Sequence, residues 1–141
     1  MSLVDGAFDV FTGRVSPDGR WLAYASWESG RPEVYVRPLA GGSGRWAVST
    51  GGGEEPKWSA DGRRLYDRAN DVLMGVSVVP GSGAFEFAQP QQVLAGLSTP
   101  RTESGLTYEV DPKAERFLML RPGSENATAQ SLRLIVTSAR D

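Results

Sequence analysis

The side chains of this 141-residue chain that could do chemistry are mainly carboxylates, guanidinium groups and indoles. Cysteine and histidine are both absent. Without cysteine there is no disulfide, no thiolate nucleophile and no cysteine-ligated metal. Without histidine there is no Ser-His-Asp triad and no histidine-rich metal site. The composition therefore predicts a protein that is not an enzyme by itself, with no catalytic residue, no cofactor and no metal.

One group of carboxylates still needs weighing. Glu54 and Glu55 are adjacent, and together with Asp71 they could offer several oxygens to a hard cation such as Ca²⁺. No EF-hand-like spacing supports such a site. Paired carboxylates can also hydrolyse glycosidic bonds, but nothing here fixes the separation which that reaction needs. We therefore expect no ion and no hydrolase site at these residues.

A glycine run, Gly51–Gly53, resembles the loops that cradle phosphate. No Lys-Ser/Thr pair and no predicted helix follow it, so the usual reasons for an anion site are missing. A flexible connecting loop is the favoured interpretation.

The overall charge and hydropathy exclude other classes of partner. The formal net charge is −2, so there is no basic excess to bind a phosphate backbone, and we expect no nucleic acid partner. No apolar run approaches 18 residues, so no spanning helix and no membrane insertion are predicted. The first residues lack the basic and apolar regions of a signal peptide.

The elements that must position these side chains are repeated. Val15–Tyr24 reads VSPDGRWLAY and recurs as WSADGRRLY from Trp58, with 43 residues from Ser16 to Ser59. A third and more divergent copy begins at Val110. A repeat of this length, made of short β-strands, is typical of propellers and related arrays.

Between clusters of glycine and proline lie short runs rich in Val, Tyr, Trp, Phe and Leu, which predict an all-β chain. The predicted strands of the first unit are 8–16, 20–26, 33–37 and 45–49. Those of the second are 56–59, 63–68, 72–79 and 91–95, and those of the third are 107–110, 116–121 and 131–137, without a fourth strand. Several of these strands are apolar on both faces and must be covered on both.

The turn between the first two strands of each unit has a clear mechanism. Pro17 presets φ for a type I turn, Gly19 takes the positive φ that follows, and the Ser16 hydroxyl can cap the turn amides. The second copy keeps Ser, Asp and Gly. The third loses the glycine and gains a residue, so we expect a looser turn there.

The ordered set of motifs resembles the TolB-like six-bladed propeller repeats. More narrowly, it resembles the C-terminal propeller region of bacterial serine/threonine protein kinases and related sensors. The segments that carry this resemblance are Ser16–Tyr24, Val34–Leu39, Val48–Gly52, Pro56–Ser59, Val72–Val76, Phe117–Leu120 and Leu132–Val136.

The resemblance implies a single domain over residues 1–141, built as a β-propeller segment of about three four-stranded antiparallel blades. Blade 1 is expected at about 8–50, blade 2 at about 54–96 and blade 3, which is incomplete, at about 106–138. This is half of a six-bladed ring, so the chain is either a fragment or one of two copies that close a ring. Exposed sheet edges promote such association, which is the physical motive for a homodimer.

In a propeller, the loops that follow the second and fourth strands of each blade share one rim. We therefore expect a polar surface on that rim, made by Glu28, Arg31, Glu54, Glu55, Arg68, Asn70, Asp71, Arg101 and Glu103. The alternative interpretation is ordinary solvated loops. Among the indoles, Trp21 and Trp58 are predicted to pack in the core, and Trp27 and Trp46 to be exposed.

The function predicted from these features is a non-catalytic protein-interaction or sensor module that binds a protein partner. By resemblance its location is periplasmic or otherwise outside the cytoplasm. Two alternatives remain open: the gating or sensing propeller of a larger enzyme, such as a prolyl-oligopeptidase-like hydrolase or a receptor kinase, and a glycan-binding array of blades.

Overall fold

The computed structural model describes residues 10–42, 44–79, 83–96, 108–111, 116–122 and 132–138. Within these ranges every regular element is a β-strand, and the strands form antiparallel sheets. The all-β prediction is therefore confirmed. No described helix is long and apolar enough to cross a membrane.

The first sheet is a four-stranded antiparallel meander. Its strands are β1 (Val10–Val15), β2 (Trp21–Ser26), β3 (Glu33–Pro38) and β4 (Trp46–Ala47), in that spatial order. The four strands expected from the sequence are present. The fourth is shorter than expected, because β4 is paired only through Val36↔Trp46 and Tyr35↔Ala47.

The second sheet has five strands rather than four. They are β5 (Glu54–Trp58), β6 (Arg64–Ala69), β7 (Val72–Val79), β8 (Glu86–Phe87) and β9 (Gln91–Leu94). The additional strand, β8, pairs with the end of β7 through Val78↔Phe87, whereas β9 pairs with its beginning through Leu73↔Leu94. Eight-residue β7 is long enough to hold both short partners along one edge.

The third sheet contains β10 (Tyr108–Val110), β11 (Arg116–Pro122) and β12 (Leu132–Ser138), each antiparallel to its neighbour. Among the described residues it has three strands, as the sequence predicts.

The two well-preserved turns have the same hydrogen bonds. In the first, Gly19 N donates to Ser16 O at 2.9 Å, Trp21 N donates to Ser16 Oγ at 3.0 Å, and Gly19 has φ 75°. In the second, Gly62 N donates to Ser59 O at 3.0 Å, and Arg64 N donates to Ser59 Oγ at 3.0 Å. The predicted serine cap is confirmed. The third turn, which we expected to be looser, lies outside the described residues.

Two apolar clusters join the sheets. The first lies between sheets one and two, where Trp21, Val34 and Val36 pack with Leu65 and Phe85. The second lies between sheets two and three and contains Tyr66, Leu73, Tyr108 and Phe117. The middle sheet is thus covered on both faces, which explains its two-sided apolar sequence.

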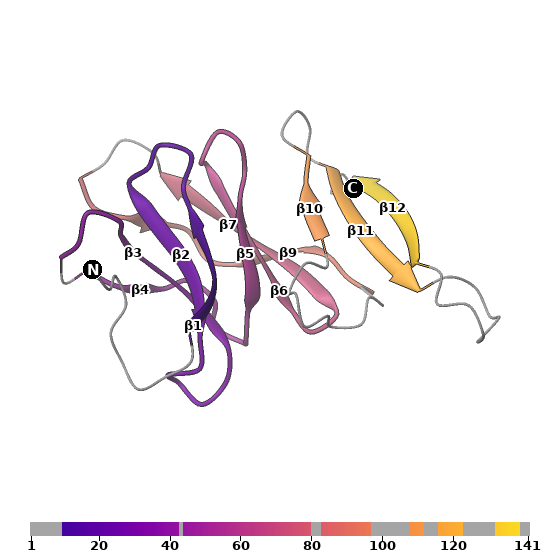
Figure 1. Cartoon of the computed structure of the whole chain (residues 1–141), viewed down its shortest axis with the longest axis horizontal. Helices are drawn as coiled ribbons and strands as arrows, with labels where there is room; N and C mark the ends of the chain where they lie inside the picture. The colour runs from indigo at the N-terminus through magenta and orange to yellow at the C-terminus, as the bar shows by residue number, and fades with distance from the viewer. Residues whose placement is uncertain are drawn as a thin grey trace.

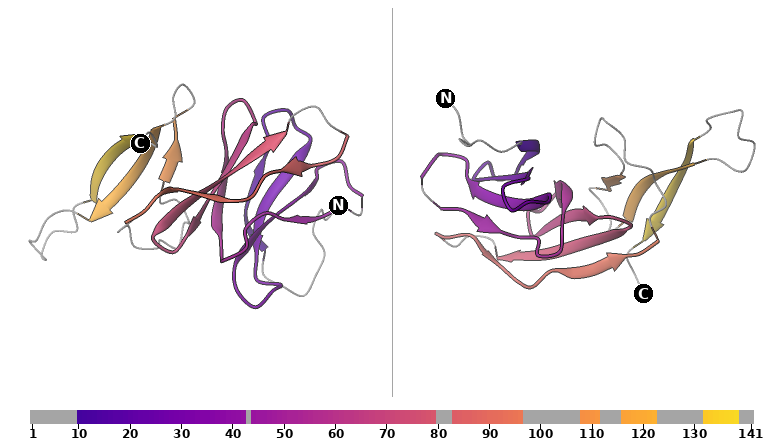
Figure 2. Two further views of the ribbon diagram at one scale, coloured as in Figure 1. Left: turned by 180° about the vertical axis from the view of Figure 1, so that it is seen from behind. Right: turned by 90° about the horizontal axis from the view of Figure 1, so that it is seen from below.

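The three sheets follow one another along the molecule in the order of the chain (Figure 1). Seen from below, they form an open arc, with the β1–β4 sheet and the β10–β12 sheet at opposite ends (Figure 2). The sheets do not close into a ring. This open, radial succession of antiparallel sheets is the arrangement of a propeller segment.

Candidate functional site

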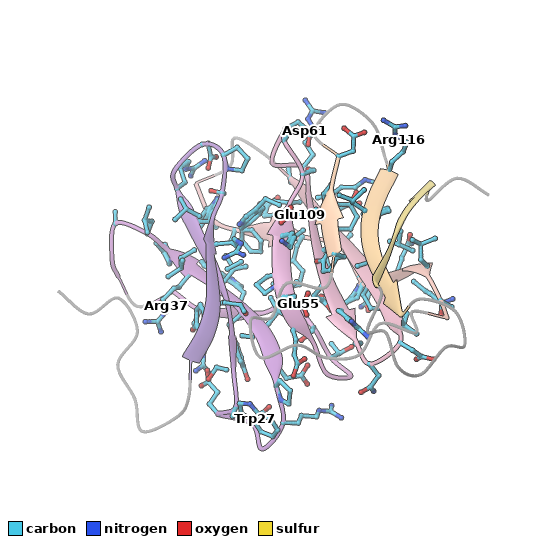
Figure 3. All side chains as sticks on the ribbon, turned by 45° about the vertical axis from the view of Figure 1, so that its right-hand side comes forward. Trp27, Arg37, Glu55, Asp61, Glu109 and Arg116 are labelled. Carbon is cyan, nitrogen blue, oxygen red and sulfur yellow. The ribbon has the colours of Figure 1, made fainter. Side chains whose placement is uncertain are left out.

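The loops of the chain lie at two opposite ends of the sheets. Figure 3 shows Trp27, which begins the β2–β3 loop, at one end, and Asp61, in the β5–β6 turn, at the other, with Glu55 between them. We call the end that carries Trp27 and the loops 27–32, 48–53 and 70–71 the Trp27 rim. The tight serine-capped turns occupy the opposite rim.

The first charged residues of the Trp27 rim are held in ion pairs. Glu28 pairs with Arg45, which is next to β4. Arg31 pairs with Glu33 at 3.1 Å, and its Nη2 donates to the carbonyl oxygen of Thr50 at 2.9 Å. Since Arg31 is largely exposed while Glu33 is buried, this contact joins the rim to the interior.

Glu33 organises the neighbouring glycine loop and was not identified by the sequence. Its Oε1 accepts hydrogen bonds from Ser49 Oγ at 2.6 Å and from Gly52 N at 2.9 Å. Gly53 N donates to Pro32 O at 2.9 Å, and a Cβ at Gly53 would lie 2.8 Å from Ser49 Cβ and Oγ. The loop is therefore tied to the first sheet, in contrast to the expected flexible connection.

Glu55 and Arg68 lie beneath the Trp27 rim rather than on it, because both are buried. The carbonyl oxygen of Glu55 accepts a hydrogen bond from Tyr108 Oη at 2.7 Å, across to the third sheet. Arg68 Nε donates to the carbonyl oxygen of Asn70 at 2.7 Å. These two residues support the loops and do not offer their charges to a partner.

Asn70 and Asp71 are exposed at the β6–β7 turn, and Glu54 is half-buried at the start of β5. Arg101 and Glu103 lie outside the described residues. Over the described ranges, no three His, Cys, Asp or Glu side chains are grouped so that they could hold a metal ion. Glu54, Glu55 and Asp71 accordingly do not form a carboxylate cage.

Asp67, in the middle of β6, is the most unusual group of this region. It is fully buried, and neither carboxyl oxygen has a hydrogen-bond partner in the described structure. Burial, together with the nearby charge of Glu33, raises its pKa to about 8. The carboxyl is thus largely protonated at neutral pH.

Asp67 lines a cavity of about 330 Å³ beneath the Trp27 rim. Loop residues Thr50, Gly51, Asn70 and Asp71 form its exposed mouth, and Ser49 and Asp67 are its most buried residues. The sequence did hold a signal for this site. Asp67 takes the place in the repeat that Tyr24 and Met119 take in the other two copies, so a carboxylate interrupts an apolar position.

A second, smaller group of charges lies on the first strand of each sheet (β1, β5 and β10, called the inner strands below), toward the opposite rim. Equivalent positions of β1, β5 and β10 carry Arg14, Lys57 and Glu109, as their pairing to Ala23, Tyr66 and Leu118 shows. Lys57 Nζ lies 2.5 Å from Glu109 Oε1. This ion pair joins the second and third sheets beside a cavity of about 240 Å³.

One of the four tryptophan side chains is packed against the core where the sequence predicts exposure. Trp21 is buried as expected, and Trp58 is half-buried against the same core. Trp46 was expected to be exposed, but it packs edge-on against Trp21, with ring centroids 5.7 Å apart. The reason is that β4 lies at the margin of the first cluster. Trp27 is 45% exposed, as predicted.

Comparison with known proteins supports a propeller-like class. No family profile matches the chain. A tricorn protease homologue of Streptomyces coelicolor is 51% identical over 39 residues, which are 28% of this chain and 3% of that protein. The matched segment is therefore a small part of that relative.

The similar solved structures share little sequence identity with this chain, and the first of them supports the fold alone. A protein of Bacteroides uniformis described as a 6-phosphogluconolactonase has a TM-score of 0.57 and 15% identity, over 96% of this chain and 43% of its own. TolB from Acinetobacter baumannii gives a TM-score of 0.43 and 12% identity, over 96% and 44%. This chain thus spans less than half the length of these two structures. The fold is a propeller-like module.

Proposed function

We propose that this chain is a non-catalytic protein-interaction or sensor module that binds its partner through the Trp27 rim. The observation that supports this most directly is the exposed indole of Trp27 beside charges that are already held in place. Tryptophan and arginine are the residues that most often dominate binding energy at protein interfaces. Here Trp27 adjoins the Glu28–Arg45 pair, and Arg31 is fixed by two contacts.

Prearranged side chains lower the entropy lost on binding. Arg31 bonded to Glu33 and Thr50 O needs little further ordering when a partner arrives. The opposite rim offers less, since its turns are short and their polar groups bond to each other, as Ser59 and Asp61 do at 2.7 Å.

Cross-linking would test the rim directly. A photoreactive benzoylphenylalanine replaces Trp27 in one protein and exposed Arg63, on the opposite rim, in a control. We expect specific cross-links from position 27 only. A partner identified in this way is then purified, and Trp27→Ala should weaken its binding at least tenfold, while Arg63→Ala leaves it unchanged. Equal binding by both variants would contradict the proposal.

We propose in addition that a second copy of this chain binds at the open ends of the arc and completes the ring. The supporting feature is the open arc, which leaves the first and third sheets at opposite ends. Light scattering after size-exclusion chromatography tests it on the 15.2 kDa chain. A mass of two chains that does not change with concentration is expected, and a monomer at all concentrations would contradict it.

The second candidate is the gating or sensing propeller of a larger enzyme. The short, close match to a tricorn protease homologue favours it. Reading the gene around this segment distinguishes the two candidates, because only this one requires a catalytic domain on the same polypeptide.

A periplasmic or other extracytoplasmic location remains part of the first proposal, and fractionation of cells that express the full gene tests it.

A further inference from the structure

The cavity beneath the Trp27 rim holds a charge-bearing group without a partner. Both carboxyl oxygens of Asp67 are buried and unbonded among the described residues. Buried polar groups are nearly always hydrogen-bonded, and an exception calls for a specific explanation such as a functional role or a bound ion. Ionising a carboxyl group in a low-dielectric site costs free energy, and a cation paired with it offsets part of that cost.

The lining of the cavity indicates which charge a ligand would need in order to fit it. Asp67 is the buried acidic residue of the cavity and Asp71 lies at its mouth. No lysine or arginine is among the described residues that line it. Glu33, which also acts on Asp67 electrostatically, adds negative charge from β3. The cavity therefore favours a cation over an anion.

A metal ion is a poor match for this cavity. Hard cations need several oxygen ligands, and the described residues hold no group of three acidic or other ligating side chains. The oxygens of Glu33 are already occupied by Ser49, Gly52 and Arg31. Asp67 is thus the one acidic side chain of the cavity that is both buried and unbonded in the described structure.

The shape of the site narrows the ligand further. Two free carboxyl oxygens match the paired N–H groups of a planar guanidinium, which binds carboxylates in a bidentate manner. Val72, Met74 and Pro90 add apolar side chains to the lining. Apolar lining of this kind suits the methylene groups of an aliphatic stem.

We propose that this cavity binds a guanidinium group on an aliphatic stem, with Asp67 as its ionic partner and Val72, Met74 and Pro90 around the stem. The guanidinium comes either from an arginine side chain of a protein or from a small guanidino compound. The mouth of the cavity belongs to the Trp27 rim, but Trp27 itself does not line the cavity. Cross-linking from position 27 and binding of a small guanidine therefore test the two proposals separately.

The test uses butylguanidine as the probe and butylurea, which has the same shape but no charge, as its control. Binding is followed at pH 9 through the backbone amide signals of Gly51, Gly52 and Asn70 in NMR spectra. Saturable shifts are expected with butylguanidine and none with butylurea. Absence of saturation with butylguanidine, or equal binding of butylurea, would overturn the proposal.

Variants place the binding at Asp67. Asp67→Asn keeps the volume of the side chain but removes the charge, and should weaken butylguanidine binding at least tenfold. Glu86→Gln removes the same charge from an exposed residue outside the cavity and should leave binding unchanged. If Asp67→Asn binds as well as the wild type, the proposal is wrong. Tighter binding of Ca²⁺ than of butylguanidine, lost in the same variant, would likewise overturn it.

Two further measurements separate the sources of the ligand. A capped tripeptide with one internal arginine is compared with butylguanidine. Tighter binding of the peptide supports an arginine of a protein, and weaker binding supports a small guanidino compound. Because the carboxyl must lose its proton to pair with the cation, binding of either probe should strengthen up to about 100-fold from pH 6 to pH 9.

Discussion

Thr12 in β1 and Glu55 in β5 occupy equivalent positions of the repeat and adopt the same left-handed backbone, with φ of 52° and 53°. Each lies where the strand pairing shifts register, between Phe11 and Arg14 in one sheet and between Glu54 and Lys57 in the other. These are β-bulges on the inner strands. Left-handed conformations are unfavourable for residues other than glycine and commonly mark sites that the surrounding structure holds in place.

The first prediction concerns the strain at Thr12. Thr12→Gly should raise the free energy of unfolding by roughly 1 kcal/mol, because glycine adopts positive φ without steric cost and the buried, unbonded Thr12 hydroxyl is removed. Urea denaturation measures the change. The matched control is Gly19→Ala. At Gly19, φ is 75° and no atom lies within 4 Å of the added methyl group. The left-handed conformation alone should therefore lower the free energy of unfolding of this variant by about 1 kcal/mol. Destabilisation by Thr12→Gly would show that this bulge is not strained.

The second prediction compares the two serine caps. Ser16→Ala should cost about 1–2 kcal/mol, because the hydroxyl accepts from the buried amide of Trp21 and donates to Asp18 at 2.6 Å. Ser59→Ala removes the same two bonds, but the amide of Arg64 is exposed and water can replace the hydroxyl. It should therefore cost less. Thermal or urea unfolding of both variants makes the comparison, and equal losses would contradict it.

The third prediction is a pH dependence of stability. With a pKa of about 8 in the folded state, Asp67 keeps its proton between pH 4 and pH 8, where an unfolded aspartate has lost it. The folded state then binds more protons than the unfolded state, so stability should fall as pH rises, by up to about 1.4 kcal/mol per pH unit. Above the folded pKa this slope ends.

Asp67→Asn provides the control for this dependence, because asparagine does not titrate. The other titratable groups near Asp67 are unchanged in the variant: Glu33 from β3, Asp71 from the next turn, and Tyr108 from β10. Burial raises the pKa of Tyr108 well above its usual value. The difference in slope between the two proteins, measured by urea unfolding at pH 5 and pH 7.5, therefore isolates Asp67. Identical slopes would show that the carboxyl is ionised in the folded protein.

The fourth prediction concerns the attachment of the third sheet. Tyr108→Phe leaves the buried carbonyl of Glu55 without its donor and should cost about 1–2 kcal/mol. The ring itself stays in the cluster with Leu73 and Phe117, so packing is preserved. Hydrogen exchange should accelerate more in β10 than in β2. A uniform acceleration over both strands would indicate that the bond does not act locally.

The sequence predicts the architecture well because its signals are local. Ser16, Gly19 and their counterparts in the second copy define turns within a few residues, and the strands between them follow from alternation and apolar content. Strand β8 was not predicted, since Glu86–Phe87 is too short to stand out and forms because β7 extends beyond β9.

The site was predicted less well because it depends on contacts between sheets. Nothing near Glu33 in the sequence shows that Ser49 and Gly52 will bond to it, and Trp46 is covered by Phe85 from the neighbouring sheet. Asp67 was recognisable in principle, by comparing the copies position by position. Its burial beside Glu33 could not be foreseen from either strand alone.

The inner-strand position held by Arg14, Lys57 and Glu109 has a consequence for how this gene can change. The charge at this position runs positive, positive, negative over the three copies, and among the described residues Lys57 pairs with Glu109 of the sheet that follows it. A tandem duplication of the second repeat would place a further lysine between Lys57 and Glu109, so that the present Lys57 would lose its neighbouring carboxylate. The present order of the second and third copies is thus the one that brings opposite charges together at this position.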